Sequence, residues 1–221
     1  VRSHELMQAL HGDLESQRGT LACRAEVVGA RLVRDAHVVR VMHDETHSEF
    51  TPRLLVNAAG LHAQSLAHRL EGLDADTIPP LYLAKGQYFT LQGRAPFNHL
   101  VYPVASSAGL GIHVTLDLAG GVRFGPDVEW VSSIDYSVDA TRREAFASAI
   151  RRYYPDLDAT RLQPGYAGIR PKLAAPGEPA ADFCIQGPAA HGWPGLVHLY
   201  GIESPGLTAA LAIADDVATV L

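Results

Sequence analysis

The sequence predicts a mixed α/β (α+β) protein in which a strand–helix portion is interrupted by an antiparallel sheet. The last residues, 196–221, read as a strand, a Gly-rich turn and a small-residue helix. Between 81 and 125, short apolar runs alternate with Gly-rich turns, a pattern typical of an antiparallel sheet. We therefore expect one portion built from 1–76 and 189–221, with a second portion, 77–188, inserted in it.

The first portion combines helical and extended patterns. Apolar residues at helical spacing predict a helix over 3–16. Extended apolar runs follow, and the polar stretch 43–46 suits a hairpin turn. The expected strands and helix of this portion lie at 20–32, 36–42, 50–57 and 62–70.

The inserted portion is expected to be mainly strands. Asp139 is expected to cap a helix that runs to about Tyr153 and ends before Pro155. The expected strands lie at 82–83, 87–91, 100–104, 111–118, 122–125, 165–170 and 182–186.

The turn after the strand 196–200 is expected to present backbone N–H groups at a helix N-terminus. Pro205 suits the first turn, where its missing N–H costs nothing, and Ser204 is a candidate cap. The helix would run from about Leu207. Such a helix end attracts an anionic or electron-rich ligand group, although most strand–turn–helix units are only scaffold.

Composition narrows the class of protein. The chain has 221 residues, 47% hydrophobic and 19% charged, as in an ordinary globular protein. A net charge of −6 without a basic stripe argues against a nucleic-acid partner. The two cysteines indicate no disulfide framework, and no signal peptide or 18-residue apolar run appears. We expect a cytoplasmic protein with no transmembrane segment; peripheral association with a membrane stays open.

Several sequence blocks together resemble the D-amino-acid-oxidase-like superfamily of FAD-dependent oxidoreductases. The resemblance covers nearly the whole chain and is strongest to the branch containing L-2-hydroxyglutarate oxidases and dehydrogenases. The blocks, in the order of that branch, are VNAAGLHAQSLA (56–67), KGQYFTL (85–91), VYPVASSAGLGIHVTLDLAGGVRFGPDVEW (101–130), GYAGIRPKL (165–173), DFCIQGP (182–188) and GIESPGLTAALAIADDVA (201–218).

This resemblance implies a partial FAD-binding Rossmann-like domain, 1–76 and 189–221, around a substrate-binding domain, 77–188. The family begins with a strand, a GxGxxG turn and a helix that hold the FAD pyrophosphate, and this chain contains no GxGxxG. We therefore expect the C-terminal part of a longer, truncated enzyme that does not retain FAD by itself. The implied cofactor-binding residues are Val27, Ala59, Gly60, Gly201, Ile202, Glu203, Ser204, Gly206, Leu207 and Thr208.

Arg170 is the strongest single candidate for substrate binding. It ends an apolar strand before Pro171, and a guanidinium there can bind a carboxylate through two hydrogen bonds. An isolated Arg is more often a surface residue. The resemblance favours the functional interpretation, because the family's matching Arg often binds the substrate carboxylate beside the flavin.

His113 is the candidate catalytic base, because alcohol oxidation needs a group that accepts the hydroxyl proton. The alternative is a packed or exposed strand His without a catalytic role. Tyr88 and Tyr102 are hydrogen-bond candidates for the same pocket, although strand tyrosines usually serve packing. Lys85 would contact a second substrate carboxylate and Lys172 would add charge, unless both are solvated.

No metal site is expected. His43 and His47 are four residues apart, but the local pattern is a turn, so we interpret them as solvated residues.

The resemblance implies FAD-dependent oxidation of a 2-hydroxy acid, such as L-2-hydroxyglutarate, to the 2-oxo acid. The flavin would take up the hydride at N5, and quinone or oxygen would be the electron acceptor. One alternative is an amine or amino-acid oxidase of the glycine or sarcosine type. Another is a flavin-free, non-catalytic module, suggested by the absent GxGxxG.

Overall fold

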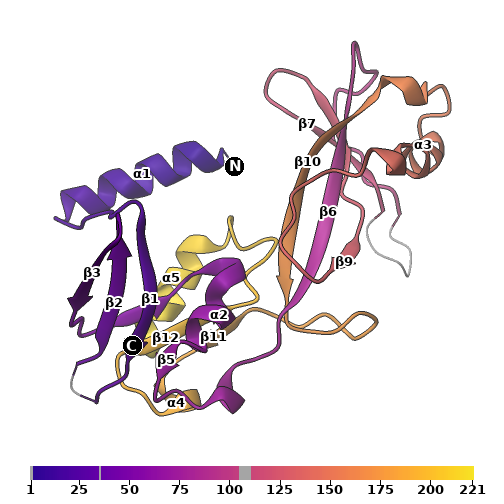
Figure 1. The fold of residues 1–221 in the computed structure, drawn as a ribbon. Helices are drawn as coiled ribbons and strands as arrows, with labels where there is room; N and C mark the ends of the chain where they lie inside the picture. The colour runs from indigo at the N-terminus through magenta and orange to yellow at the C-terminus, as the bar shows by residue number, and fades with distance from the viewer. Residues whose placement is uncertain (1, 35, 105–110) are drawn as a thin grey trace. The chain divides into compact units, whose positions relative to one another are not determined.

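The computed structural model describes residues 2–34, 36–104 and 111–221, and it confirms a mixed α/β fold (Figure 1). The chain divides into two compact units. Unit one comprises Val1–Leu81 and Pro171–Leu221, and unit two comprises Tyr82–Arg170. The boundaries differ from the expected ones mainly over 171–188, because the strand β11 (Cys184–Gln186) pairs with a strand of unit one.

Unit one contains a four-stranded sheet in the order β3-β2-β1-β5. Its first three strands form an antiparallel meander, and the fourth runs parallel to β1. The turn expected at 43–46 is confirmed, since Asp44 and Glu45 link β2 to β3 with positive φ. The strands are β1 (Ala25–Arg31), β2 (Val38–His43), β3 (Thr46–Phe50) and β5 (Leu70–Glu71).

The second sheet of unit one has the order β11-β12-β4. Here β12 (Leu196–Tyr200) pairs antiparallel with β11 and parallel with β4 (Leu55–Asn57). The single strand expected over 50–57 is wrong, because Phe50 ends the hairpin and extended pairing resumes only at Leu55. Leu196, Val197 and Tyr200 are fully buried, so β12 lies in the interior of this unit.

Four helices accompany these two sheets in the described part of unit one. The expected helix over 3–16 is confirmed as α1. The helix expected over 62–70 is shorter, because a 3-10 turn (Gly60–His62) precedes it and Leu70 joins β5. The helices are α1 (Ser3–Ser16), α2 (Ala63–Ala67), α4 (Pro188–His191) and α5 (Ala210–Val220).

Unit two is built on one antiparallel sheet whose main path is β10-β6-β8-β7, with β9 paired to β6. The two expected strands 82–83 and 87–91 form one strand, β6. The strand expected over 100–104 is wrong: Val101 makes a single bridge to Val114. The strands are β6 (Tyr82–Leu91), β7 (His113–Leu116), β8 (Val122–Gly125), β9 (Glu129–Val131) and β10 (Leu162–Lys172).

One face of this sheet is covered by the helix α3 (Arg143–Arg151), through buried Phe146, Ala147 and Ile150. As expected, the Asp139 side chain accepts a hydrogen bond at the start of the helical segment, from the Thr141 N–H at 2.9 Å. The sheet contributes Phe89, Val114, Val122, Phe124 and Leu162 to the same core.

The Gln87 side chain is fully buried and ties β6 to the segment that leads into α3. Its Oε1 accepts a hydrogen bond from the Asp139 N–H at 2.7 Å, and its Nε2 donates to Glu129 at 3.0 Å. Arg142 pairs with Asp127 at 2.7 Å beside it. These bonds hold the part of β6 next to Tyr88 against the segment that leads into α3.

Within the described ranges, no helix is long and apolar enough to cross a membrane.

Candidate active site

The sheet of unit two has one apolar and one polar face. The register pairs Phe89 with Phe124 and Val114 with Phe124, and all three side chains are buried in the core. Because side chains alternate along a strand, the residues next to them point to the opposite face. That face carries Tyr88, Thr90, His113, Thr115 and Arg123, and we call it the polar face.

His113 lies at the start of β7 on the polar face and is 92% buried, with 8% of its surface exposed. The Tyr102 ring stacks on its imidazole with the ring centroids 4.6 Å apart. Burial lowers the pKa of His113, the Arg170 charge lowers it further, and the Gly111 backbone opposes the shift. The imidazole is therefore neutral near pH 7, the state that a general base requires.

Tyr88 and Arg170 belong to the same group of side chains. The Tyr88 ring stacks on Tyr166 of β10, with centroids 4.5 Å apart. Burial raises the pKa of Tyr88 to about 12; Tyr166 acts in the same direction and the positive charge of Arg170 opposes it. The structure thus brings together four sequence-predicted residues, namely Tyr88, Tyr102, His113 and Arg170.

Two predicted lysines have other partners. Lys85 is 6% exposed at its side chain, and its Nζ pairs with Asp135 at 2.9 Å. Lys172 pairs with Glu203 within unit one. Their charges are compensated inside the protein, so the structure favours a structural role for both over contact with a substrate carboxylate.

The polar face also carries two residues that were not predicted as site residues. Tyr166 stacks on Tyr88, and the Arg123 guanidinium lies over the Tyr166 ring, 5.6 Å from its centroid. The alternation Val122-Arg123-Phe124 in β8 was the available signal for Arg123. Pairing between β6 and β10, which are far apart in the chain, cannot be derived from alternation alone.

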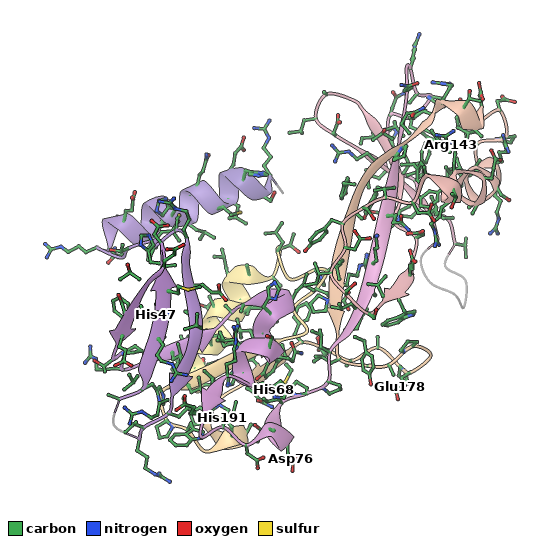
Figure 2. All side chains as sticks on the ribbon, in the orientation of Figure 1. His47, His68, Asp76, Arg143, Glu178 and His191 are labelled. Carbon is green, nitrogen blue, oxygen red and sulfur yellow. The ribbon has the colours of Figure 1, made fainter. Side chains whose placement is uncertain are left out.

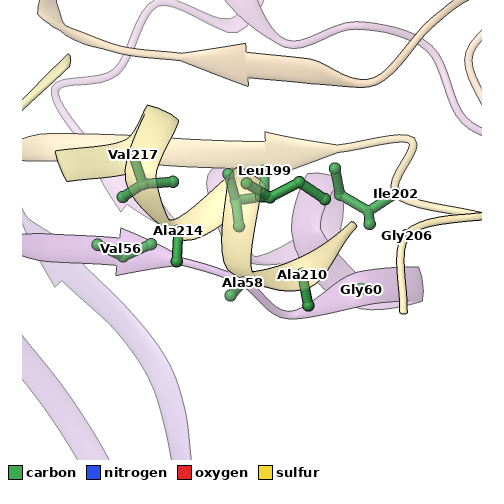
Figure 3. A pocket seen from close by; sticks show the side chains of 10 residues that line it. Val56, Ala58, Gly60, Leu199, Ile202, Gly206, Ala210, Ala214 and Val217 are labelled. Carbon is green, nitrogen blue, oxygen red and sulfur yellow. The ribbon is translucent and has the colours of Figure 1, made fainter. Parts of the chain in front are cut away.

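Unit one contains a separate cavity of about 440 Å³ between β4, β12 and α5 (Figure 3). Its walls are small or aliphatic, and three lining residues, Gly60, Ile202 and Gly206, were predicted to bind the cofactor. The remaining lining residues are Val56, Ala58, Leu199, Ala210, Ile213, Ala214 and Val217.

Glycine is favoured by its positive φ at one position around this cavity and required by close contacts at another. Gly60 follows β4 with φ +57°, and a Cβ there would meet no atom within 4 Å, so open space adjoins it. At Gly206, a Cβ would lie 2.6 Å from Ile202 and 2.7 Å from the Glu203 carbonyl oxygen. The tight turn before α5 therefore depends on the missing side chain.

The helix start was predicted too early. α5 begins at Ala210, and no side chain caps it, so the expectation that Ser204 is the cap is wrong. A turn precedes the helix instead, in which the Pro205 carbonyl accepts hydrogen bonds from Thr208 and Ala209. The turn delays the helix by three residues, because Pro205 and Gly206 favour turn conformations.

The other predicted cofactor residues lie in several elements of unit one. Val27 is in β1, where the pairing with β2 shifts register before Gly29. The Ala59 N–H bonds to the Asn57 side chain at 3.3 Å. Gly201 is buried with φ +67°, Leu207 is 48% exposed, and Glu203 holds Lys172. A role in FAD binding stays a prediction for all of them.

No metal centre is found among the described residues: none of their His, Cys, Asp and Glu side chains form a group of three that could hold an ion. His43 and His47 are exposed on the β2–β3 hairpin, and Figure 2 labels His47 there.

The sequence matches the family model described as FAD dependent oxidoreductase over residues 1–220. It is 54% identical to the mitochondrial L-2-hydroxyglutarate dehydrogenase of Arabidopsis thaliana over 186 residues, covering 79% of this chain and 38% of that protein. It is 26% identical to the Escherichia coli L-2-hydroxyglutarate dehydrogenase, covering 98% of this chain and 58% of that protein. The chain thus spans 38% and 58% of the length of these two relatives.

A solved structure shows the same fold. The dithionite-reduced L-alpha-glycerophosphate oxidase of Mycoplasma pneumoniae with FAD bound matches with a TM-score of 0.75 and 25% identity. The match covers 94% of this chain and 52% of that one.

Proposed function

This chain belongs to the FAD dependent oxidoreductase family, and from that premise we propose that it forms the substrate-oxidising part of an enzyme acting on 2-hydroxy acids. The substrate class is that of the L-2-hydroxyglutarate dehydrogenases to which it is similar. The observation that carries the proposal is the group formed by His113, Tyr88, Tyr102 and Arg170 in unit two.

The chemistry of this group suits a hydroxy acid. Arg170 would bind the C1 carboxylate and hold the C2 carbon in one orientation. Neutral His113 would accept the proton of the C2 hydroxyl group, and its lowered pKa keeps it neutral at working pH. Stacked Tyr102 fixes the plane of the imidazole and shields it from water.

FAD, when bound, would supply the acceptor for the hydride that leaves C2. The cavity of unit one could take an apolar part of the cofactor, because its lining is aliphatic and open space adjoins Gly60. Ala59, Gly60 and the segment 201–208 would hold the cofactor by their backbone. We propose quinone or oxygen as the final electron acceptor. A cytoplasmic location stays a prediction.

Exchange of Arg170 for methionine tests the proposal in the flavin-loaded enzyme. Reduction of the flavin by L-2-hydroxyglutarate is followed as loss of its visible absorption. Loss of the charge-assisted bonds should lower kcat/KM by about 100-fold or more. Arg94→Met is the matched control, because Arg94 is exposed in the same unit. Flavin reduction by sarcosine but not by L-2-hydroxyglutarate would favour the amine-oxidase alternative and refute the proposal.

A further inference from the structure

The polar face of unit two carries a second arginine besides Arg170. Arg123 lies on β8, directly paired with Thr90 of β6 and Thr115 of β7. Its flanking residues, Val122 and Phe124, are buried in the core, so its side chain leaves the sheet on the side of His113 and Tyr88.

Aromatic packing fixes where this guanidinium lies. Its central carbon is 5.6 Å from the centroid of the Tyr166 ring, within the range of a cation–π contact. Tyr166 stacks on Tyr88, and the Arg170 charge acts on Tyr88. Both arginines therefore act on the same tyrosine pair, Arg123 through Tyr166 and Arg170 through Tyr88.

Arg123 keeps capacity for a ligand. Its single ion pair in the described part of the chain is a 3.6 Å contact with Asp117, and 40% of its side chain is exposed. Asp117 itself accepts two backbone N–H bonds in its own turn, from Ala119 and Gly121. A guanidinium has five N–H donors, so a carboxylate can bind without breaking the aromatic contact.

The spacing of groups in a hydroxy diacid suits two cations on one face. The two carboxylate carbons of a five-carbon diacid lie about 5 Å apart when the chain is extended. The two arginines act on the stacked pair Tyr88–Tyr166, whose ring centroids are 4.5 Å apart. Lys85, the earlier candidate for the second carboxylate, is instead buried against Asp135.

We propose that Arg123 determines specificity by binding the second carboxylate of a 2-hydroxy dicarboxylic acid whose first carboxylate is bound by Arg170. This inference rests on the proposed function and names the substrate class of the same site. Thr90 and Thr115 flank Arg123 on the neighbouring strands, and their hydroxyl groups donate to the backbone carbonyl oxygens of Gln163 and Arg123, both at 3.4 Å, so the second carboxylate is left to the guanidinium.

The test compares two substrates of the flavin-loaded enzyme, L-2-hydroxyglutarate and the monocarboxylic L-2-hydroxybutyrate. Arg123→Met should lower kcat/KM for the diacid by about 10- to 100-fold, mainly through KM, because one charge-assisted contact is lost. The rate on the monoacid should stay unchanged. Arg123→Lys should restore part of the preference, and Arg94→Met should keep all of it.

A binding measurement on the 221-residue chain is independent of turnover. The side-chain Nε–Hε NMR signal of Arg123 should shift on titration with glutarate, and butyrate at equal concentration should shift it much less. Equal shifts with both acids, or none, would overturn the inference.

The kinetic outcomes separate the two proposals. A wild-type enzyme that oxidises neither acid would overturn the proposed function, and this inference with it. A wild type that prefers the diacid, with an Arg123→Met variant that keeps this preference, would overturn the inference alone. Equal losses on both acids would also contradict it, because they would indicate a general structural effect.

Discussion

Replacing Gln87 by leucine should destabilise unit two, although the two side chains have similar size. Gln87 is fully buried in β6, and its amide makes two short hydrogen bonds, to the Asp139 N–H at 2.7 Å and to Glu129 at 3.0 Å. Leucine removes both and leaves the Asp139 N–H without this acceptor. Glu129 keeps a longer contact with Arg142 at 3.4 Å.

The magnitude follows from these two bonds. A hydrogen bond between neutral groups contributes about 1 kcal/mol net, and one to a charged group contributes about 2 kcal/mol. The third contact, to Asp127 at 3.5 Å, is too long to add much. We therefore expect the free energy of unfolding of unit two to fall by about 3 kcal/mol.

Urea unfolding followed by circular dichroism measures this change. The midpoint should fall while the slope of the transition stays constant, because the same surface is exposed on unfolding. Gln92→Leu is the control, since Gln92 is exposed directly after β6, and its effect should be within about 0.5 kcal/mol. A loss below about 1 kcal/mol in Gln87→Leu would refute the role assigned to the network.

Two further predictions concern the pH dependence of stability in unit one and the residue that binds the second carboxylate of the substrate. Burial lowers the pKa of the fully buried His198 to about 4, and the charge of His191 acts in the same direction. The free energy of unfolding should therefore keep its full value above pH 6.5 and fall by about 3 kcal/mol as the pH drops to 4. Urea unfolding at both pH values measures this fall, and His68→Gln, at an exposed histidine, is the control. A fall in His198→Gln equal to that of the wild type would contradict the prediction. Lys85→Met should leave the preference for L-2-hydroxyglutarate over L-2-hydroxybutyrate unchanged, because Lys85 is occupied by Asp135; a selective loss on the diacid would return the second-carboxylate role to Lys85.

Elements with a strong apolar period were predictable from sequence, and polar ones were not. α1 and β12 follow the expected bounds because helical spacing and a short, mostly apolar run are local signals. β3 has the sequence THSEF with every residue exposed, so it has no apolar alternation to detect. Its pairing with β2 depends on the turn at Asp44 and Glu45.

The candidate site was predicted in part for the same physical reason. His113 and Arg170 stood out because their chemistry and the family blocks coincided. Arg123 and Tyr166 were missed. The alternation Val122-Arg123-Phe124 indicates only that Arg123 faces away from the core, and the importance of both residues depends on ring stacking between β6 and β10, which no local pattern encodes. Lys85 was placed by its residue type and its family block, and its exposed partner Asp135 lies fifty residues further along the chain.

The most direct measurement is a crystal structure of the flavin-loaded enzyme, kept reduced so that no turnover occurs, with L-2-hydroxyglutarate bound. The account predicts one carboxylate on Arg170 and the C2 hydroxyl within hydrogen-bond distance of the His113 imidazole. Both contacts should lie on the face of the unit-two sheet opposite Phe89 and Phe124. An acid bound elsewhere, with Arg170 and His113 not touching it, would contradict the central claim.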